Sequence, residues 1–171
     1  MKILVLSDSH GSTAVMRTVI QKFEKDAGAV IHLGDFFIDA IRNKPECSLH
    51  FVRGNCDGSS YDGAEVPTEK VVDIGGIKIF MTHGHRYGVK YGMDRLVYAA
   101  LEREADVCLY GHTHAPAVFR EEGIIYMNPG SISRPRDARA PSYGVLDIEN
   151  SAVTASVVGM VKGSYMLLLS M

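Results

Sequence analysis

The chain has 171 residues, a length that suits one domain with its own hydrophobic core. Its 18 lysines and arginines and 20 aspartates and glutamates give a net charge of −2, which argues against long nucleic acid or a membrane surface as partner. Three widely spaced cysteines do not suggest a disulfide framework, so we expect a cytoplasmic location.

The first half of the chain alternates predicted strands and helices. Residues 2–7 form a continuous apolar run, which is typical of a strand covered on both faces. Helices are expected over residues 12–26 and 36–43, and further strands over residues 29–33 and 48–52. This order predicts right-handed crossovers and a mostly parallel sheet.

The second half is richer in predicted strands. Residues 53–67 have the composition of a loop, and residues 69–74 and 77–82 flank Gly75-Gly76, a hairpin signal. An amphipathic helix is expected over residues 89–104. Short strands should follow at residues 106–110, 117–120, 124–127, 143–148, 152–158 and 164–169. The pattern indicates an α/β fold with two packed sheets and outer helices.

The apolar run at the end of the chain, residues 165–169, is too short to span a bilayer. We expect it to form a buried strand or a sheet-edge strand. An apolar edge strand would be a candidate interface for a homo-oligomer. Neither this run nor the short apolar run at the N-terminus predicts a membrane protein.

Five short motifs carry side chains of the types that bind metals, and four of them directly follow an apolar run. They are Asp8-Ser9-His10, Gly34-Asp35, Gly54-Asn55-Cys56-Asp57, Thr82-His83-Gly84-His85 and Gly111-His112-Thr113-His114. The seven candidate ligands are Asp8, His10, Asp35, Asn55, His83, His112 and His114. Seven such groups exceed the needs of one tetrahedral zinc and fit two metals that share a bridging carboxylate.

Each motif taken alone has an ordinary structural explanation. Aspartate before a helix is more often a cap than a ligand, and Gly-Asp or Gly-Asn is a common turn. Ligands in α/β proteins, however, lie at the carboxyl ends of parallel strands, where Asp8 and Asp35 are predicted to be. In extended chain, each His-x-His would present both rings to one centre. We interpret His32, within a predicted strand, as a core or supporting residue.

From Asp8 to Ser131, the order, spacing and flanking glycines of these motifs resemble the calcineurin-like metallophosphoesterases, and in particular their small bacterial and archaeal phosphodiesterase branch. The resemblance implies an α/β fold built as a four-layer α/β/β/α sandwich, with two mixed β-sheets flanked by helices. It implies a single domain over residues 1–171 without a cap domain. The dinuclear metal site would lie at the loop ends.

The resemblance also assigns the ligands to two divalent ions that share Asp35. The first ion would be held by Asp8, His10, Asp35 and His114, and the second by Asp35, Asn55, His83 and His112. This mixed oxygen and nitrogen set suits Mn²⁺, Fe, Co²⁺, Ni²⁺ or Zn²⁺ better than Ca²⁺ or Mg²⁺. The family usually favours Mn²⁺. A hydroxide bridging the metals would attack the phosphorus of a small phosphodiester in line.

The chain departs from the wider superfamily at the residue after Asn55. That superfamily has Gly-Asn-His, whose histidine is thought to help protonate the leaving alkoxide, whereas this chain has Cys56. A thiol can donate a proton but matches neutral pH less well than imidazole. Cys56 is at least as easily explained as a small apolar filler, and protonation would then fall to His85 or water. The candidate catalytic residues are Asn55, Cys56 and His85.

Two other functions are compatible with parts of the sequence. A subunit of the retromer complex has this fold with a degraded ligand set and works through protein contacts, so a protein-binding scaffold is one alternative. All seven ligand positions are filled here, which argues against a pure scaffold. Metal-dependent amide hydrolases with His-x-His typically use (β/α)₈ barrels of about 250 residues, longer than this chain.

The substrate is less constrained than the metal ligands. No cap domain fits between Asp57 and His83, so the site should be shallow and open to small phosphodiesters. Cyclic nucleotides, dinucleotides and nucleic-acid ends remain open, while the net charge disfavours long nucleic acid. Arginines after Ser131 could bind phosphate, although a solvated loop is the commoner outcome. These are Arg134, Arg136 and Arg139.

Overall fold

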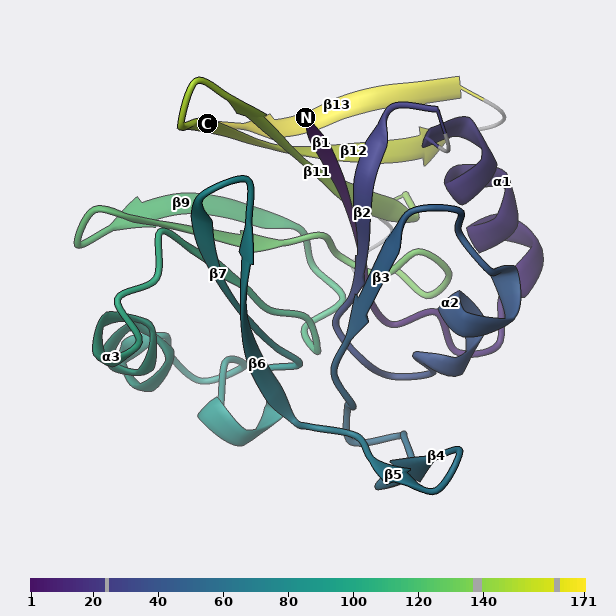
Figure 1. Ribbon diagram of the computed structural model, residues 1–171, viewed down its shortest axis with the longest axis horizontal. Coiled ribbons are helices and arrows are strands. Elements are labelled where there is room, and N and C mark those ends of the chain that lie inside the picture. The colour runs from purple at the N-terminus through teal and green to yellow at the C-terminus, as the bar shows by residue number, and fades with distance from the viewer. Residues whose placement is uncertain (24, 137–139, 162–163) are drawn as a thin grey trace.

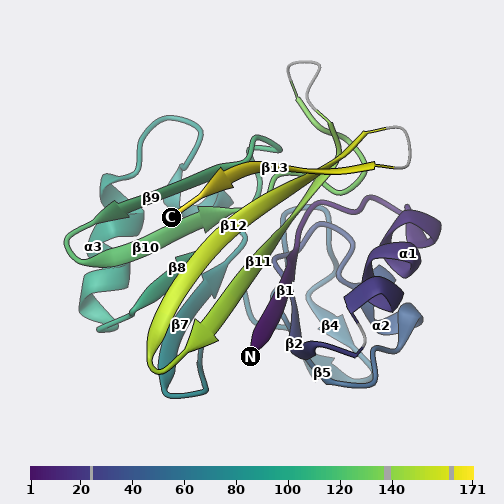
Figure 2. The same cartoon turned by 90° about the horizontal axis from the view of Figure 1, so that it is seen from above.

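Two stacked β-sheets with helices on both outer faces make up the molecule, as the four-layer sandwich predicts (Figures 1 and 2). The computed structural model describes residues 1–23, 25–136, 140–161 and 164–171. The strand order is β13-β12-β11-β1-β2-β3 in one sheet and β6-β7-β8-β10-β9 in the other. Both sheets contain parallel and antiparallel pairs, so both are mixed.

The six-stranded sheet is built around the N-terminal strand. Its strands are β1 (Lys2–Leu6), β2 (Ala27–His32), β3 (Ser48–Phe51), β11 (Ser142–Glu149), β12 (Ala152–Val161) and β13 (Ser164–Ser170). The first three are parallel, as the alternation of strands and helices predicts. The pairs β1–β11, β11–β12 and β12–β13 are antiparallel, so the prediction of a mostly parallel sheet is wrong for the sheet as a whole. Helices α1 (Thr13–Phe23) and α2 (Ile38–Asn43) cover its outer face beside β1–β3 (Figure 1).

The five-stranded sheet is built from the middle of the chain. Its strands are β6 (Glu69–Ile74), β7 (Ile77–Thr82), β8 (Val107–Leu109), β9 (Ala117–Glu121) and β10 (Ile124–Asn128). Strand β8 is parallel to both β7 and β10, while β6–β7 and β9–β10 are antiparallel pairs. Helix α3 (Asp94–Glu102) packs Leu96 and Ala100 against Phe80 and Tyr126 on the outer face.

Strand β1 shows how the sequence produces the layers. Ile3 and Val5 lie in the core between the two sheets, whereas Leu4 and Leu6 pack in the cluster under α1. All four side chains are fully buried, which explains the uninterrupted apolar run. Burying each such side chain contributes about 1.5–3 kcal/mol. This rigid strand carries Asp8 at its carboxyl end.

The elements differ from the sequence predictions mainly at their ends. The predicted helix over residues 89–104 begins only at Asp94. It is preceded by a separate 3₁₀ helix, η1 (His85–Tyr87), which ends at left-handed Gly88. The predicted loop 53–67 contains a short hairpin, β4 (Ser60–Tyr61) and β5 (Ala64–Glu65). Its turn residues Asp62 and Gly63 have positive φ angles, as a two-residue hairpin turn requires.

Strand β13 lies at the edge of the six-stranded sheet, which confirms the sheet-edge interpretation of the C-terminal apolar run. Tyr165, Met166 and Leu167 are exposed there, so the alternative of a buried strand is wrong for these residues. Among the described residues, no helix combines the length and the apolar character needed to cross a membrane.

Candidate metal centre

The motif-bearing loops meet at the carboxyl ends of five strands. Hydrogen bonds join the loops to one another: Asp8 N donates to the carbonyl of Gly34 at 3.0 Å. On the other sheet, Gly111 N donates to the carbonyl of His83 at 3.1 Å. The parallel strands place their carboxyl ends on one side, as expected for a ligand site in an α/β fold.

Five of the seven candidate ligands have a left-handed backbone conformation. The φ angles are 55° at Asp8, 45° at His10, 56° at Asp35, 69° at His112 and 58° at His114. Such a conformation costs roughly 1–2 kcal/mol for each non-glycine residue, and it is typical of functional sites where the surrounding structure enforces it. The strain is concentrated where the side chains converge.

The His-x-His motifs do not lie in extended chain, so that part of the sequence prediction is wrong. His112 and His114 lie in a turn whose φ angles are positive, and Gly84 between His83 and His85 has a φ of 94°. In the second motif the turn directs the two rings to different neighbours. The ring of His112 lies 5.1 Å from that of His83, whereas the ring of His114 lies 5.1 Å from that of His10.

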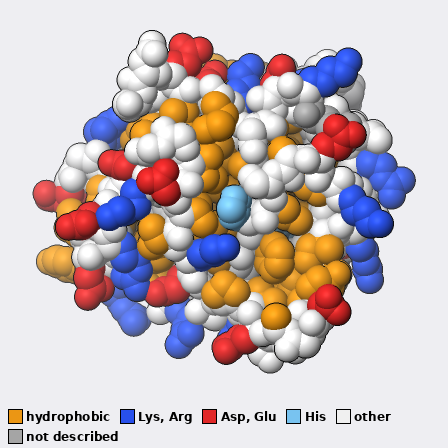
Figure 3. Space-filling view, viewed as in Figure 1, with side chains coloured by type: hydrophobic (Ala, Val, Ile, Leu, Met, Phe, Trp, Pro, Cys, Tyr) orange, Lys and Arg blue, Asp and Glu red, His pale blue; other side chains and the backbone are white. Residues whose placement is uncertain are grey.

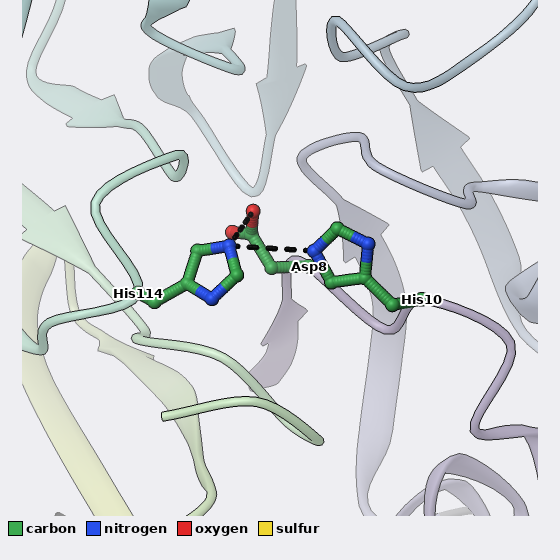
Figure 4. Close-up of side chains that lie close together, drawn as sticks. All are labelled: Asp8, His10 and His114. Atoms are coloured by element: carbon green, nitrogen blue, oxygen red, sulfur yellow. Dashed lines mark hydrogen bonds and ion pairs between the residues drawn. The ribbon is translucent and has the colours of Figure 1, made fainter. Parts of the chain in front are cut away.

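Asp8, His10 and His114 form the first cluster (Figure 4). His114 Nε2 lies 3.1 Å from Asp8 Oδ1 and 3.3 Å from His10 Nε2. The other nitrogen of His114, Nδ1, donates to the carbonyl of Arg134 at 2.6 Å. When the ring is neutral, this bond leaves a lone pair on Nε2 that points to the cluster, as in histidines that bind metals.

Asp35 and His83 form the second cluster, with Asp8 beside them. His83 Nε2 lies 3.5 Å from Asp35 Oδ1, and His83 Nδ1 donates to the carbonyl of Leu33 at 2.8 Å. The second oxygen of Asp35, Oδ2, lies 3.9 Å from His10 Nε2. The two oxygens of Asp35 therefore face one imidazole from each cluster.

Burial and charge set the protonation states of the cluster residues. Burial lowers the pKa of His10, and burial followed by the charges of His83 and Lys90 lowers the pKa of His112 to about 4. The contact between the His114 ring and the Asp8 carboxylate raises the pKa of His114. Burial of Asp8 acts to raise its pKa, but His114, His83 and Ser7 together lower it. The carboxylate of Asp8 is thus held in its charged form.

The buried atoms of the site test whether a metal fits there. Asp8 Oδ1 and His83 Nε2 are buried, and among the described residues neither has a hydrogen-bond partner when His114, whose Nε2 lies 3.1 Å from Asp8 Oδ1, is neutral. The two atoms lie 4.0 Å apart. A buried polar atom without a partner costs about 1–3 kcal/mol, and two acceptors that face each other favour a cation between them. The donor set therefore fits a metal ion.

Asn55 and Cys56 lie at the exposed rim of the site. The side-chain amide of Asn55 donates to Cys56 Sγ at 3.4 Å, and the backbone N–H of Cys56 donates to Asp35 Oδ1 at 2.8 Å. Burial and then the Asp35 carboxylate raise the pKa of the Cys56 thiol to about 11. The exposed position does not fit a small apolar filler.

His85 lies beside the second cluster. Its ring is 5.4 Å from the ring of His83 and 6.0 Å from that of His112. Burial lowers its pKa, so the ring is neutral near pH 7. His85 Nδ1 is buried without a hydrogen-bond partner in the part of the chain that the structure describes.

Asp57 organises the loop that carries Asp35, a role that the sequence analysis missed. Its Oδ2 accepts the backbone N–H groups of Asp35 at 2.7 Å and Gly54 at 2.8 Å. Its Oδ1 accepts those of Phe36 at 2.7 Å and Phe37 at 3.3 Å. An aspartate three residues from a glycine in a polar loop is a known turn signal, but it does not reveal the contacts with residues 35–37.

A buried hydrogen-bond network supports the loop between Asp8 and His10. Ser9 Oγ donates to Asp39 Oδ2 at 2.8 Å and accepts from His32 Nε2 at 3.2 Å, because His32 Nδ1 is occupied by the N–H of Gly34. The prediction that His32 is a core or supporting residue is confirmed. No sequence pattern indicates that Asp39 is the partner of Ser9.

Residues 128–136 hold the loops from the other side. Ser131 Oγ donates to the carbonyl of Asp8 at 2.8 Å, and Asn128 Nδ2 donates to that of Gly111 at 2.9 Å. The side chains of Arg134 and Arg136 are exposed. Arg139 lies outside the described residues.

Comparisons with known proteins agree with this geometry. Residues 1–151 match the model of the calcineurin-like phosphoesterase superfamily domain. The chain is 35% identical over 154 residues to the probable metallophosphoesterase YsnB of Bacillus subtilis, covering 90% of this chain and 88% of that protein. It is 31% identical over 177 residues to the phosphodiesterase YfcE of Escherichia coli, covering 91% and 92%.

Among solved structures, a single-mutant Vps29 from Entamoeba histolytica is similar with a TM-score of 0.81 and 25% identity, over 100% of this chain and 99% of that one. The fold, the geometry of the site and the sequence similarity all indicate the same family. The chain belongs to the calcineurin-like phosphoesterase superfamily, whose members are hydrolases that act on phosphoester bonds.

Proposed function

We propose that this protein hydrolyses small phosphodiesters with two divalent transition-metal ions held by the clustered aspartates and histidines. One observation carries the proposal. Asp35 Oδ1 lies 3.5 Å from His83 Nε2, and Asp35 Oδ2 lies 3.9 Å from His10 Nε2. A carboxylate placed between two imidazoles in this way is suited to bridge two ions.

The proposed ligand sets follow the two clusters. The first ion would be held by Asp8, His10, Asp35 and His114, and the second by Asp35, Asn55, His83 and His112. We favour Mn²⁺, with Fe, Co²⁺, Ni²⁺ and Zn²⁺ as alternatives that suit the same mixed donors. When bound, the two ions would activate a water molecule as the nucleophile at neutral pH and would neutralise charge on the phosphate.

The protein's own residues would orient these ligands. The carbonyls of Leu33 and Arg134 hold the rings of His83 and His114, so that Nε2 of each faces the site. Asp8 keeps its position because its Oδ2 accepts from Ser7 Oγ at 2.5 Å and from His112 N at 3.2 Å. Against two divalent ions, the charges of Asp8 and Asp35 leave about two positive charges for a phosphate ester.

Weak leaving-group protonation would favour phosphodiesters with acidic leaving groups. In the metal-free protein, burial and the Asp35 carboxylate raise the pKa of the Cys56 thiol to about 11, which makes the thiol a weak acid. His85 is neutral there because its pKa is lowered by burial. The relative YfcE is named a phosphodiesterase, which supports diesters as the substrate class.

We further propose a single domain over residues 1–171 without a cap, located in the cytoplasm. Between Asp57 and His83 the chain forms only the β4–β5 hairpin and strands β6 and β7. A site without a cap would stay open to varied small substrates. A homo-oligomer through the exposed β13 edge remains a prediction.

A protein-binding scaffold is the second candidate function, because the fold is similar to Vps29 over the whole chain. Vps29 is a vacuolar protein sorting protein. The clustered ligands favour the enzyme, since a scaffold has no need for buried acceptors that face each other. The two functions differ in whether the metal-loaded protein turns over substrate.

The test is hydrolysis of bis(4-nitrophenyl) phosphate by the Mn²⁺-loaded protein. We expect turnover that EDTA removes, that added Mn²⁺ restores and that His112→Ala abolishes. His50→Ala is the matched control, since His50 is half-buried on β3 outside the clusters. Turnover that survives both EDTA and His112→Ala would contradict the proposal. A metal-loaded protein without turnover would favour the scaffold.

A further inference from the structure

An exposed phenylalanine lies directly beside the candidate metal centre. Phe36 is 37% exposed, and its ring lies 5.6 Å from the ring of His10 with a tilt of 57°. The neighbouring Phe37 is only 4% exposed and stacks on Phe51. The two consecutive phenylalanines therefore have different roles: Phe37 belongs to the core, and Phe36 faces solvent at the site.

The backbone of Phe36 is fixed by hydrogen bonds at both of its polar groups. Its N–H donates to Asp57 Oδ1 at 2.7 Å, and its carbonyl accepts from Asp39 N at 2.9 Å. The φ angle is 76°, a value that is an outlier for a bulky side chain and that glycine adopts freely. Neither the backbone nor the core requires a phenyl ring at this position.

The ring lies beside a polar side chain and outside the apolar cavity next to β3. That cavity, of about 340 Å³, lies in an apolar patch between β3 and the β4–β5 hairpin (Figure 3) and is lined by Phe51 and Tyr61 but not by Phe36. The ring of Phe36 lies beside the imidazole of His10, while its backbone N–H donates to the carboxylate of Asp57. A single flat ring in polar surroundings suits the face of a nucleobase, whereas an alkyl chain needs a continuous apolar surface.

We propose that Phe36 is a stacking surface for the nucleobase of a substrate whose phosphate lies at the metal centre, so that the substrates are nucleoside phosphodiesters. The inference rests on the proposed function and names its substrate class. One sugar joins a base to its phosphate, and Phe36 contacts the ligand His10 directly. A single nucleotide can therefore reach the ring and the metal centre together.

The direct test compares the binding of AMP and inorganic phosphate to the Mn²⁺-loaded protein by calorimetry. Stacking of a base on an aromatic ring changes affinity by about 5- to 150-fold. We expect AMP to bind the wild type roughly tenfold more tightly than phosphate. Phe36→Gly should abolish this preference, leave the phosphate affinity unchanged and not lower the unfolding temperature. Phe36→Trp should retain the preference.

Tyr98→Ala is the matched control, because Tyr98 is 73% exposed on α3 and lies outside the candidate site. It should leave both affinities unchanged. An unchanged ratio of AMP to phosphate affinity in Phe36→Gly would overturn the inference. Equal weakening of both ligands with a lower unfolding temperature would also overturn it, since the ring would then be structural.

A kinetic comparison separates the base from the leaving group. Thymidine 5′-(4-nitrophenyl phosphate) and methyl 4-nitrophenyl phosphate share one leaving group, and Phe36→Gly should raise KM for the thymidine ester alone. An equal rise for both esters would place the nitrophenyl group on Phe36 and overturn the inference. Because the binding comparison needs no turnover, an inactive metal-loaded protein would count against the proposed function alone.

Discussion

His83 Nε2 lies 3.5 Å from Asp35 Oδ1, in a part of the site where both residues are buried. Because His83 Nδ1 donates to the carbonyl of Leu33, a neutral His83 turns a lone pair toward the carboxylate. Two acceptors that face each other away from water repel unless a proton or a cation lies between them. His83 is therefore the residue whose loss should reveal metal dependence most clearly.

Replacing His83 by alanine should weaken Mn²⁺ binding and lower turnover, each by at least about 100-fold. Removing a residue that only supports a metal ligand costs up to about 100-fold, and removing the ligand itself should cost at least as much. The rise in unfolding temperature on adding Mn²⁺ should shrink accordingly. A ligand at 100 times its Kd stabilises the folded state by about 2.7 kcal/mol. Calorimetry and thermal unfolding measure these effects, with His50→Ala as control. Wild-type Mn²⁺ affinity in His83→Ala would contradict the assignment.

Asp57→Asn should disturb the site without removing a ligand. The amide NH₂ group would face backbone N–H groups that the carboxylate of Asp57 now accepts, such as those of Asp35 and Phe36. We expect a loss of roughly 1–3 kcal/mol in the free energy of unfolding and 10- to 100-fold weaker Mn²⁺ binding. Asp62→Asn, on the exposed turn of the β4–β5 hairpin, should change neither. Equal effects of the two variants would remove the positioning role of Asp57.

Cys56 tests where the leaving-group proton comes from. Because an activated aryl leaving group needs little protonation, and because burial and Asp35 raise the pKa of the Cys56 thiol in the metal-free protein to about 11, Cys56→Ala should leave the rate on activated aryl diesters within about threefold of wild type. Cys56→His should raise the rate on alkyl diesters, by up to about 100-fold for a well-placed general acid. Steady-state rates on paired aryl and alkyl esters decide the matter. A large and equal loss on both esters in Cys56→Ala would make the thiol essential.

His32 should make the metal-free protein sensitive to acid. Burial lowers the pKa of His32 to about 4, against about 6.5 in the unfolded chain. Between these values the unfolded chain binds a proton that the folded chain does not. Stability is therefore complete above pH 6.5 and falls as the pH drops toward 4, by about 3 kcal/mol from this residue.

Urea unfolding of the wild type and His32→Gln in EDTA, at pH values from 4 to 7, measures this contribution. The variant should be less stable at pH 7, because a fully buried side chain is replaced, yet lose less stability on acidification. Equally steep loss of stability in both proteins would show that His32 is not the residue responsible.

The sequence predicted the parts of the site that depend on strand order. Asp8 and Asp35 follow β1 and β2, and parallel pairing of these strands brings both carboxylates to one edge. The Gly75-Gly76 turn signal between two strand-like runs predicted β6 and β7 with the bounds that the structure shows. The Asp62-Gly63 pair was a usable hairpin signal that the prediction overlooked.

Features that depend on tertiary contacts could not be predicted in this way. The left-handed turns at His112 and His114 are maintained by bonds to distant groups, such as His112 N to Asp8 Oδ2 and His114 Nδ1 to the Arg134 carbonyl. Asp57 reaches across 22 residues to Asp35. Local sequence preferences favour extended chain for a His-x-His motif and carry no information about such partners.

The presence of two ions sharing Asp35 is the central claim, and anomalous X-ray diffraction from crystals grown with Mn²⁺ tests it most directly. We predict two manganese peaks about 3.5–4 Å apart, one on each side of the Asp35 carboxylate. The first should lie among Asp8, His10 and His114, and the second beside His83 and His112. A single peak at saturating Mn²⁺, or peaks that do not contact Asp35, would contradict the account.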